Sequence, residues 1–288
     1  MRGTGHERAP GMSARRLVAA AALALAGCAP GAPGLHSPGP GALYDPGPLD
    51  DPVLGRCAWS GRVTGRFVYQ EQHLIRAYFE AADPAAYRRA IPPAFAVPER
   101  PLVRVTVLDF YAMASGPTYR ESEVSVLALH EGEPGWVVLT MPVTDGDSCG
   151  GGRSTWGYPK VVRRVTLEGG PDRYVGVSYA PGGRAPELTL TLELAGAAPG
   201  EDAREVLRFV SPFPSLTLRA GRVMRFGGDR RPAWELERAA PDVYRVRLGH
   251  ARLEVSREPD TLLRRLGVGR PLAAYWARVR ARYSITPR

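Results

Sequence analysis

The feature that most constrains the fold of this chain is a long succession of short apolar segments, nearly all bounded by glycine or proline. The chain has 288 residues, of which 33 are Gly and 28 are Pro. Short segments with turn residues between them are typical of strands in antiparallel sheets. The sequence therefore predicts a mainly β (α+β) fold, a closed antiparallel β-barrel or sandwich of short strands with a few packing helices.

The alternation of apolar and polar residues places strands along most of the chain. We expect strands over 65–77, 102–113, 121–129, 135–143, 161–167, 174–179, 188–194, 215–226, 233–238 and 243–255. Helices are predicted over 83–89, 261–266 and 272–283. In the last of these, Leu272, Trp276 and Val279 fall on one face at helical spacing.

The first 28 residues have the composition of an export signal, whether translation starts at Met1 or Met12. Two arginines after Met12 precede an apolar run over 17–26, and a small-residue cleavage site follows. The run is too short to span a bilayer as a helix. The segment 25–28, LAGC, is similar to a bacterial lipobox, in which Cys28 is lipidated, although an ordinary signal peptide with an incidental cysteine would look alike. We expect an exported protein, anchored by lipid to the cell envelope at the outer membrane.

The remainder divides into a tether and a folded domain. Residues 29–55 are rich in Pro and Gly and nearly lack an apolar pattern, which is typical of a semi-extended linker. The domain is predicted over 56–288. With Cys28 lipidated, Cys57 and Cys149 remain as a pair that could form a disulfide in an oxidising compartment. Sequence spacing alone leaves both the bonded and the free form open.

One residue type is nearly missing from the chain. Of its 38 lysines and arginines, only Lys160 is a lysine. Arginine cannot replace lysine where a neutral, nucleophilic amine is needed, because the guanidinium stays protonated. Trp156, Tyr158, Val161 and Val162 are neighbours that could desolvate such an amine. A chance surface lysine in an arginine-rich chain would give the same count, so both interpretations stand at this point.

Several function classes lack support in the sequence. The formal net charge is +9, but the arginines are scattered and form no basic block with interleaved aromatics, so nucleic-acid binding is not predicted. There is no Walker-type phosphate loop. The 5 histidines are dispersed and no Cys-x-x-Cys occurs, so neither a metal site nor a cofactor is expected.

An ordered set of short motifs resembles the acetoacetate decarboxylase superfamily. The motifs are AIP at 90–92, PLVRV at 101–105, YRES at 119–122, GR at 152–153 and, most specifically, YPK at 158–160. The likeness covers roughly 65–285. It implies a closed β-barrel-like fold with a reactive lysine in an interior cavity, and it implies that Lys160 is the Schiff-base lysine and Glu121 an acidic active-site residue. Acetoacetate decarboxylase is a known example of a lysine activated by its surroundings.

Further site residues are expected around this pair. Glu123 shares the strand face of Glu121, although two solvent-facing carboxylates would show the same spacing. Arg153 could hold a substrate carboxylate or structure its loop, and we favour the structural role. Tyr158 and Trp156 are expected to line the substrate site.

The chain also departs from the family pattern at several positions. Where the family has a second lysine, this chain has Val161, and Ser154 and Thr106 stand where acidic residues are expected. An arginine expected near the barrel mouth falls near His73, with Arg76 close by, so His73 is a candidate for substrate binding. The resemblance therefore implies imine chemistry without implying acetoacetate as the substrate.

We expect a Schiff-base-forming lyase, of decarboxylase or aldolase type, that acts on a keto acid or related carbonyl compound through Lys160. The alternative is a non-catalytic envelope lipoprotein that binds a small apolar or carbonyl ligand in the barrel. The expected partners are a small carbonyl molecule and, through Cys28, a membrane. A homo-oligomer is possible, because decarboxylases of this type tend to assemble.

Overall fold

The computed structural model describes residues 48–59, 67–196, 200–228, 231–257 and 261–285, which belong to one compact unit. The predicted export signal, with Cys28, and most of the predicted tether lie outside the described residues. None of the described helices has the length and hydropathy needed to cross a membrane.

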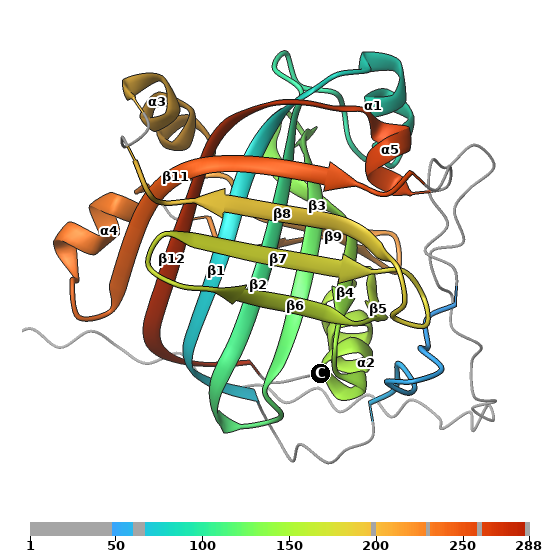
Figure 1. The fold of residues 1–288 in the computed structure, drawn as a ribbon. Coiled ribbons are helices and arrows are strands. Elements are labelled where there is room, and N and C mark those ends of the chain that lie inside the picture. The colour runs from blue at the N-terminus through green and yellow to red at the C-terminus, as the bar shows by residue number, and fades with distance from the viewer. Residues whose placement is uncertain (1–47, 60–66, 197–199, 229–230, 258–260, 286–288) are drawn as a thin grey trace, which may run out of the picture. The chain divides into compact units, whose positions relative to one another are not determined.

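Strands dominate the described chain (Figure 1). They are β1 (Phe67–Ala81), β2 (Leu102–Ser115), β3 (Tyr119–His130), β4 (Glu133–Val143), β5 (Lys160–Val162), β6 (Val165–Gly169), β7 (Arg173–Tyr179), β8 (Pro186–Glu193), β9 (Ser215–Arg219), β10 (Arg222–Phe226), β11 (Tyr244–Val255) and β12 (Val268–Ile285). The helices are α1 (Pro84–Ala90), α2 (Gly146–Trp156), α3 (Glu201–Val210), α4 (Ala233–Ala239) and α5 (Leu262–Leu266).

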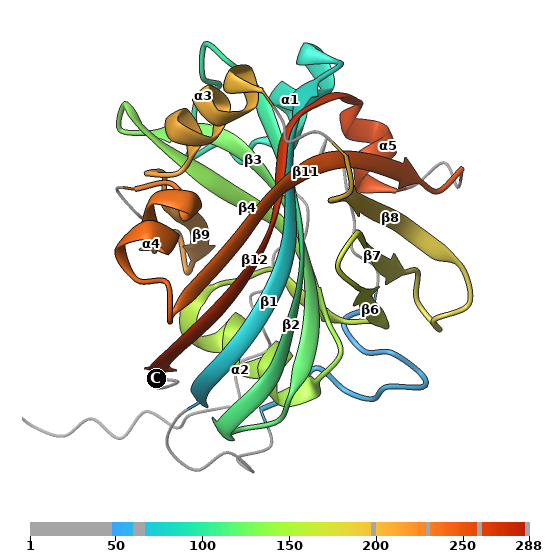
Figure 2. The same cartoon turned by 60° about the vertical axis from the view of Figure 1, so that its left-hand side comes forward.

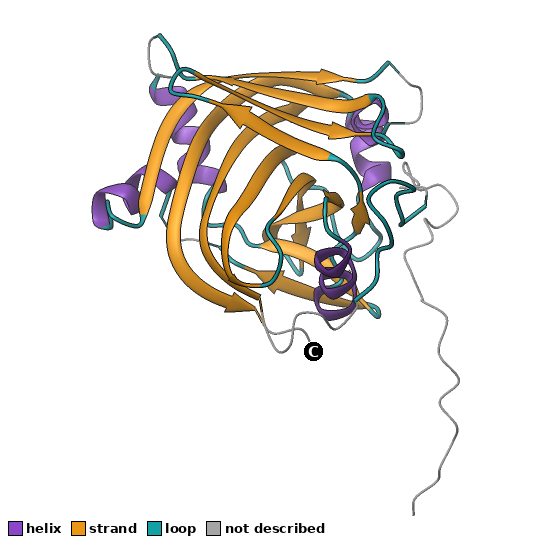
Figure 3. Cartoon of the chain, turned by 60° about the horizontal axis from the view of Figure 1, so that its bottom comes forward, coloured by secondary structure: helices purple, strands orange, loops and turns teal. Residues whose placement is uncertain are grey.

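The strands form one sheet in the order β10-β9-β4-β3-β2-β1-β12-β11-β8-β7-β6, and β5 pairs with β4 outside this path. Strand β11 lets the sheet curl, because its first half pairs with β12 and its second half with β8. A mainly β fold with a few helices is thus confirmed. The sheet was expected to close into a barrel. In the described part of the chain, β10 and β6 at the two ends do not pair with each other, and the sheet is curled but open (Figure 3).

Both faces of the central strands are buried. One face carries Ile75, Val105 and Val124 and packs against β6 and β8 and against helices α1 and α5. The other face, where Leu74, Leu108 and Glu121 lie side by side in the strand register, is here called the site face. Helices α2 and α3 contribute to the core on this second side (Figure 2).

Two segments have a different secondary structure from the one predicted. Residues 272–283 are not a helix but part of β12, which pairs with β1 along most of its length. From Ala277 onward, arginines on one face alternate with smaller or apolar residues on the other, and this period of two fits a strand better than the helical stripe did. The predicted strand 233–238 is wrong, because this segment forms α4 after Pro232. Its Glu, Leu, Ala and Arg residues favour a helix.

Other differences concern turns and helices. The predicted strand 215–226 is a hairpin of β9 and β10, which turns at Ala220 (φ 47°) and Gly221 (φ 76°). Helices α2 and α3 were not predicted. Helix α2 contains Gly146, Gly150, Gly151 and Gly152, a composition with low helix propensity, and it forms here with Asp145 accepting a hydrogen bond from the Ser148 backbone N–H at 2.7 Å.

The glycines of α2 leave room for the backbone of residues 48–59, a segment that precedes the sheet and is here called the strap. A Cβ on Gly146 would lie 2.3 Å from the Arg56 carbonyl oxygen, and one on Gly150 would lie 2.2 Å from the Trp59 nitrogen. Cys57 of the strap forms a disulfide with Cys149 of α2. The close approach of two backbones therefore explains why this helix is built from glycine.

The strap also contacts the strand that follows α2. The Val162 N–H donates to the Leu49 carbonyl at 2.8 Å, and the buried Arg163 guanidinium donates to the Pro48 carbonyl at 2.7 Å. Pro48 and Leu49, within the segment 29–55 that was predicted to be a tether, thus contact the folded domain.

Candidate active site

The structure places Lys160 where α2, β5 and the site face meet. Helix α2 ends at Gly157, which has a left-handed conformation (φ 69°) and donates its N–H to the Arg153 carbonyl. The chain then turns into Lys160, the first residue of β5, which pairs in parallel with Met141 of β4. The lysine side chain is 7% exposed. The only lysine of the chain is therefore buried rather than on the surface.

Lys160 forms an ion pair with Glu121. Its Nζ donates to Glu121 Oε2 at 3.0 Å, and the glutamate side chain is 9% exposed. Glu121 reaches the amine from β3, on the site face. The structure thus brings together the two residues for which the strongest roles were predicted.

Aromatic rings and a glycine enclose the amine. Nζ lies 5.3 Å from the ring centroid of Tyr119 and 5.9 Å from that of Tyr158. On another side, a Cβ at Gly152 would lie 2.6 Å from Lys160 Cδ, so any larger residue would displace the lysine chain. Burial raises the pKa of Tyr158 above its usual range, with smaller contributions from Glu123 and Glu121. Its hydroxyl therefore stays protonated.

Arg153 holds the lysine backbone. Its Nη1 donates to the Lys160 carbonyl oxygen at 2.6 Å, while its buried Nε has no hydrogen-bond partner. This contact corresponds to the structural role favoured for Arg153. Trp156 lies nearby, but its ring contacts Phe226, with 6.5 Å between centroids, and its carbonyl accepts a hydrogen bond from Thr217.

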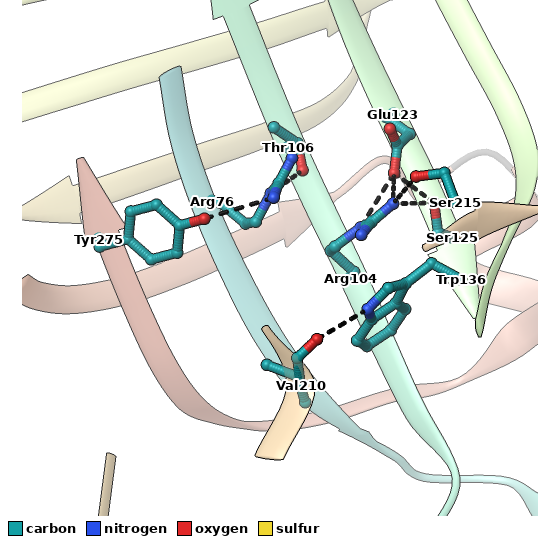
Figure 4. Close-up of polar contacts among 9 residues, drawn as sticks. All are labelled: Arg76, Arg104, Thr106, Glu123, Ser125, Trp136, Val210, Ser215 and Tyr275. Atoms are coloured by element: carbon teal, nitrogen blue, oxygen red, sulfur yellow. Dashed lines mark hydrogen bonds and ion pairs between the residues drawn. The ribbon is translucent and has the colours of Figure 1, made fainter. Parts of the chain in front are cut away.

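Glu123 is engaged in a second buried ion pair. Arg104 donates to Glu123 Oε1 through Nε at 3.0 Å and Nη2 at 2.5 Å, and both residues are buried (Figure 4). Burial opposes ionisation of Glu123, but the charges of Arg104 and Arg76 and a hydrogen bond from Ser125 outweigh it, so the pKa of Glu123 is lowered. Glu123 is thus a fixed anion that anchors an arginine.

The structure does not bring His73 to the lysine. His73 lies opposite Asp109 in the strand register, on the face of β1 away from Glu121, and its ring contacts those of Tyr111 and Tyr174. Successive side chains point to opposite faces of a strand, so Leu74 and Arg76 share the site face and His73 does not. Arg76, and not His73, therefore lies on the same face of the sheet as Glu121.

Arg76 has neutral hydrogen-bond partners. Its Nε donates to Thr106 Oγ1 at 2.9 Å and its Nη1 to the Tyr275 hydroxyl at 3.3 Å (Figure 4). Among the described residues, it makes no ion pair with a carboxylate within 4.0 Å. Its positive charge on the site face therefore interacts with the Glu123 carboxylate only beyond ion-pair distance.

A cavity of about 230 Å³ lies beside these residues. Its walls include Arg76 from β1, Arg104 from β2 and Phe226 at the end of β10. Lys160 does not line it. Tyr158 connects the two places, because its ring lies 5.9 Å from Nζ and 5.2 Å from the Phe226 ring.

Arg104 and Tyr275 had no predicted role, and Arg76 was named beside His73 without one. The available signal was the alternation in β2, where Arg104 and Thr106 occupy every second position between apolar residues on a strand buried on both faces. Polar groups inside such a strand need partners or a ligand. Among the described residues, no group of three or more His, Cys, Asp or Glu side chains could hold a metal ion.

Comparisons with known proteins agree with this geometry. The family model described as acetoacetate decarboxylase matches residues 59–285. An acetoacetate decarboxylase from Ralstonia nicotianae is 32% identical over 117 residues, which are 40% of this chain and 46% of that protein. One from Burkholderia cenocepacia is 33% identical over 111 residues, 38% of this chain and 44% of that protein. The matched region thus spans about half the length of these curated relatives.

Solved structures show the same fold. An acetoacetate decarboxylase from Legionella pneumophila superposes with a TM-score of 0.56 at 15% identity, covering 78% of this chain and 88% of that one. The enduracididine biosynthesis enzyme MppR, complexed with pyruvate, superposes with a TM-score of 0.52 at 12% identity, covering 79% and 93%. The family match covers most of the described sheet and includes the buried lysine. The chain belongs to the acetoacetate decarboxylase family.

Proposed function

We propose that this chain is a Schiff-base-forming lyase, of decarboxylase or aldolase type, that acts on a keto acid or related carbonyl compound through Lys160. The observation that carries the proposal is the buried amine of the chain's only lysine, 3.0 Å from the Glu121 carboxylate. Membership of the family supports lysine-based lyase chemistry.

The Lys160–Glu121 contact can supply the neutral amine. A free lysine is almost wholly protonated near neutral pH, and only the neutral form attacks a carbonyl. Because Nζ donates directly to Oε2, one proton transfer converts the ion pair into a neutral amine and a neutral acid. Removing both charges together suits a buried site, where isolated charges are costly. Glu121 then holds the proton that the reaction needs next.

The chemical steps balance with these two groups. Nζ attacks the carbonyl carbon, the oxygen takes the proton of Glu121, and loss of water gives an iminium ion. If the substrate carries a carboxylate on the adjacent carbon, its carbon–carbon bond breaks, carbon dioxide leaves, and the electron pair moves to the iminium nitrogen. The enamine carbon then takes a proton from solvent. Water hydrolyses the new iminium, which releases the product and the neutral Lys160 amine, and the proton set free returns to Glu121.

Arg76 and Tyr158 supply the remaining parts of the proposal. The charge of Arg76 is held by Thr106 and Tyr275, which are neutral, so it can bind a substrate carboxylate. Tyr158 contacts both Lys160 and the cavity wall, and substrate reaches the amine when this ring turns away from Phe226.

Borohydride trapping tests the proposal. The protein is incubated with acetoacetate and a panel of keto acids and aldehydes, reduced, and analysed by intact and peptide mass. Because the chain has one lysine, a side-chain adduct is assigned without ambiguity once the α-amine is mapped separately. We expect an adduct on Lys160 that is absent from the folded Lys160→Arg variant. A folded protein that forms no adduct with any member of the panel contradicts the proposal.

One observation favours the alternative, a lipoprotein that binds a small ligand without catalysis. The Lys160 amine is satisfied by Glu121 and does not line the cavity, so the cavity could bind a ligand while the ion pair serves stability. This alternative predicts ligand binding that survives in Lys160→Arg and leaves no trapped adduct. The same trapping experiment therefore separates the two functions.

We also propose that the protein is exported and anchored by lipid at Cys28. The signal-like segment before Cys28 suggests this location, and the Cys57–Cys149 disulfide supports it, because such bonds persist mainly in oxidising compartments. Metabolic labelling with a fatty acid should mark the wild type and not Cys28→Ala, which should move to the soluble envelope fraction. Unlabelled wild-type protein would contradict the anchor.

A further inference from the structure

The described residues that line the cavity beside the lysine carry positive charge only. Three arginines line it, Arg76 from β1, Arg104 from β2 and Arg231 between β10 and α4, and no described lining residue is Asp or Glu. Hydroxyl groups of Tyr78, Tyr275, Ser211 and Ser215 belong to the same walls. Burial raises the pKa of Tyr78, so this hydroxyl stays a neutral donor. The described lining residues therefore offer many hydrogen-bond donors to an anion, and none of them brings a carboxylate.

The three positive charges are only partly compensated. Glu123, behind the wall, pairs with Arg104, which is also held over the Trp136 ring at 4.8 Å and donates to Ser215 at 3.0 Å. These contacts engage Nε and Nη2 of Arg104 and none of them uses Nη1. Arg76 has neutral partners, and Arg231 is exposed at the edge of the cavity. Among the described residues, Glu123 is thus the one carboxylate that forms an ion pair with any of these three guanidinium groups.

The strand register gives the spacing of these charges. Antiparallel pairing sets side chains of the site face in successive rows: Leu74-Leu108-Glu121, Arg76-Thr106-Glu123 and Tyr78-Arg104-Ser125. Neighbouring rows are two residues apart, which is roughly 7 Å along a strand. Glu121, in the first row, forms the ion pair with Lys160. Arg76 and Arg104 lie one and two rows further along the sheet, away from Lys160 and toward the cavity.

We propose that the cavity binds the second anionic group of a dianionic substrate, a short oxo-dicarboxylate whose carbonyl is presented to Lys160. The inference rests on the proposed function and adds the substrate class. Arg76 would hold the carboxylate next to the reacting carbonyl, and Arg104 and Arg231 the distal one. A volume of about 230 Å³ suits such a molecule and is below the usual range for larger ligands.

Matched pairs of keto acids test this substrate class. α-Ketoglutarate and α-ketovalerate share a carbon skeleton and differ only in the distal carboxylate, as do α-ketoadipate and α-ketocaproate. We expect borohydride trapping on Lys160 to be about tenfold or more efficient for the dianion of at least one pair, as one charge-assisted hydrogen bond would give. Equal trapping within both pairs overturns the inference while leaving imine chemistry intact.

A variant at the edge of the cavity localises the effect. Arg231→Gln should lower trapping of the preferred dianion by roughly threefold and leave its monoanionic partner unchanged, because an exposed charge contributes less than a buried one. Arg238→Gln, on α4 and outside the cavity lining, is the matched control. An equal loss for both keto acids, or none for either, contradicts the assignment of the distal carboxylate.

A direct binding measurement keeps the inference testable if no keto acid forms an adduct. Glutarate and valerate differ by the same distal carboxylate and carry no carbonyl. Calorimetry should show tighter binding of glutarate by about tenfold, and weaker discrimination in Arg231→Gln. Failure of the proposed function then appears as no adduct with glutarate still preferred, whereas failure of the substrate class appears as equal affinity for the two acids.

Discussion

Separating the buried Lys160–Glu121 pair should destabilise the fold far more than removing both charges. The partners lie 3.0 Å apart with side chains 7% and 9% exposed. At an effective dielectric constant near 20, their attraction is about 5 kcal/mol, which offsets the cost of burying two charges. Lys160→Met alone leaves an unpaired carboxylate, and Glu121→Leu alone leaves an unpaired ammonium. Each should cost about 3–5 kcal/mol.

The double variant, Lys160→Met with Glu121→Leu, should lie within about 1 kcal/mol of the wild type, because it replaces the pair by apolar groups. Urea unfolding followed by tryptophan fluorescence gives the four free energies of the cycle. The coupling energy should therefore be at least about 5 kcal/mol, because each single variant loses about 3–5 kcal/mol and the double variant loses almost none. Single variants that cost less than about 1 kcal/mol each would refute the reasoning, since a solvated pair behaves in that way.

Three further outcomes follow from other contacts. Gly152→Ala should reduce trapping on the lysine at least about tenfold, because its Cβ would lie 2.6 Å from the lysine Cδ, while Gly170→Ala, with open space around it, should change nothing. Replacing both Cys57 and Cys149 by Ser should lower the free energy of unfolding by about 4–5 kcal/mol, since the disulfide closes a loop with a sequence separation of 92. Hydrogen bonds from Tyr111, Arg278 and Arg280 lower the pKa of Glu71 from 4.5 to about 2. The stabilisation of the folded state by Glu71 is therefore present above pH 4.5 and is lost as the pH falls toward 2. Glu71→Gln should therefore flatten the fall in Tm across that window.

The alternation of apolar residues predicted the strands well, because strands buried on one or both faces leave a direct record in the sequence. It failed for β12, where Leu272, Trp276 and Val279 fit a helix although the segment pairs with β1. It also failed for α2, whose glycines mark close contacts with the strap and Lys160 rather than a loop. Contacts between segments distant in the chain decide both cases, and local propensity does not contain them.

The candidate site was predictable to a similar degree. Lys160 and Glu121 were identified from the rarity of lysine and from short motifs, and the structure places them in contact. His73 and Arg76 show the limit. They are three residues apart, and only the strand register shows that Arg76 alone shares the face of Glu121. The sequence does not state the register, so it could not decide between them.

The disulfide has a consequence for how the chain matures. Cys57 is synthesised 92 positions before Cys149, and β1 to β4 lie between them. Under oxidising conditions, the earlier thiol has no native partner until this stretch has been made, and the nearest competitor is Cys28. If Cys28 is acylated as proposed, its sulfur is no longer a free thiol and cannot pair with Cys57. Lipid attachment would then leave Cys149 as the one remaining cysteine with which Cys57 can form a disulfide.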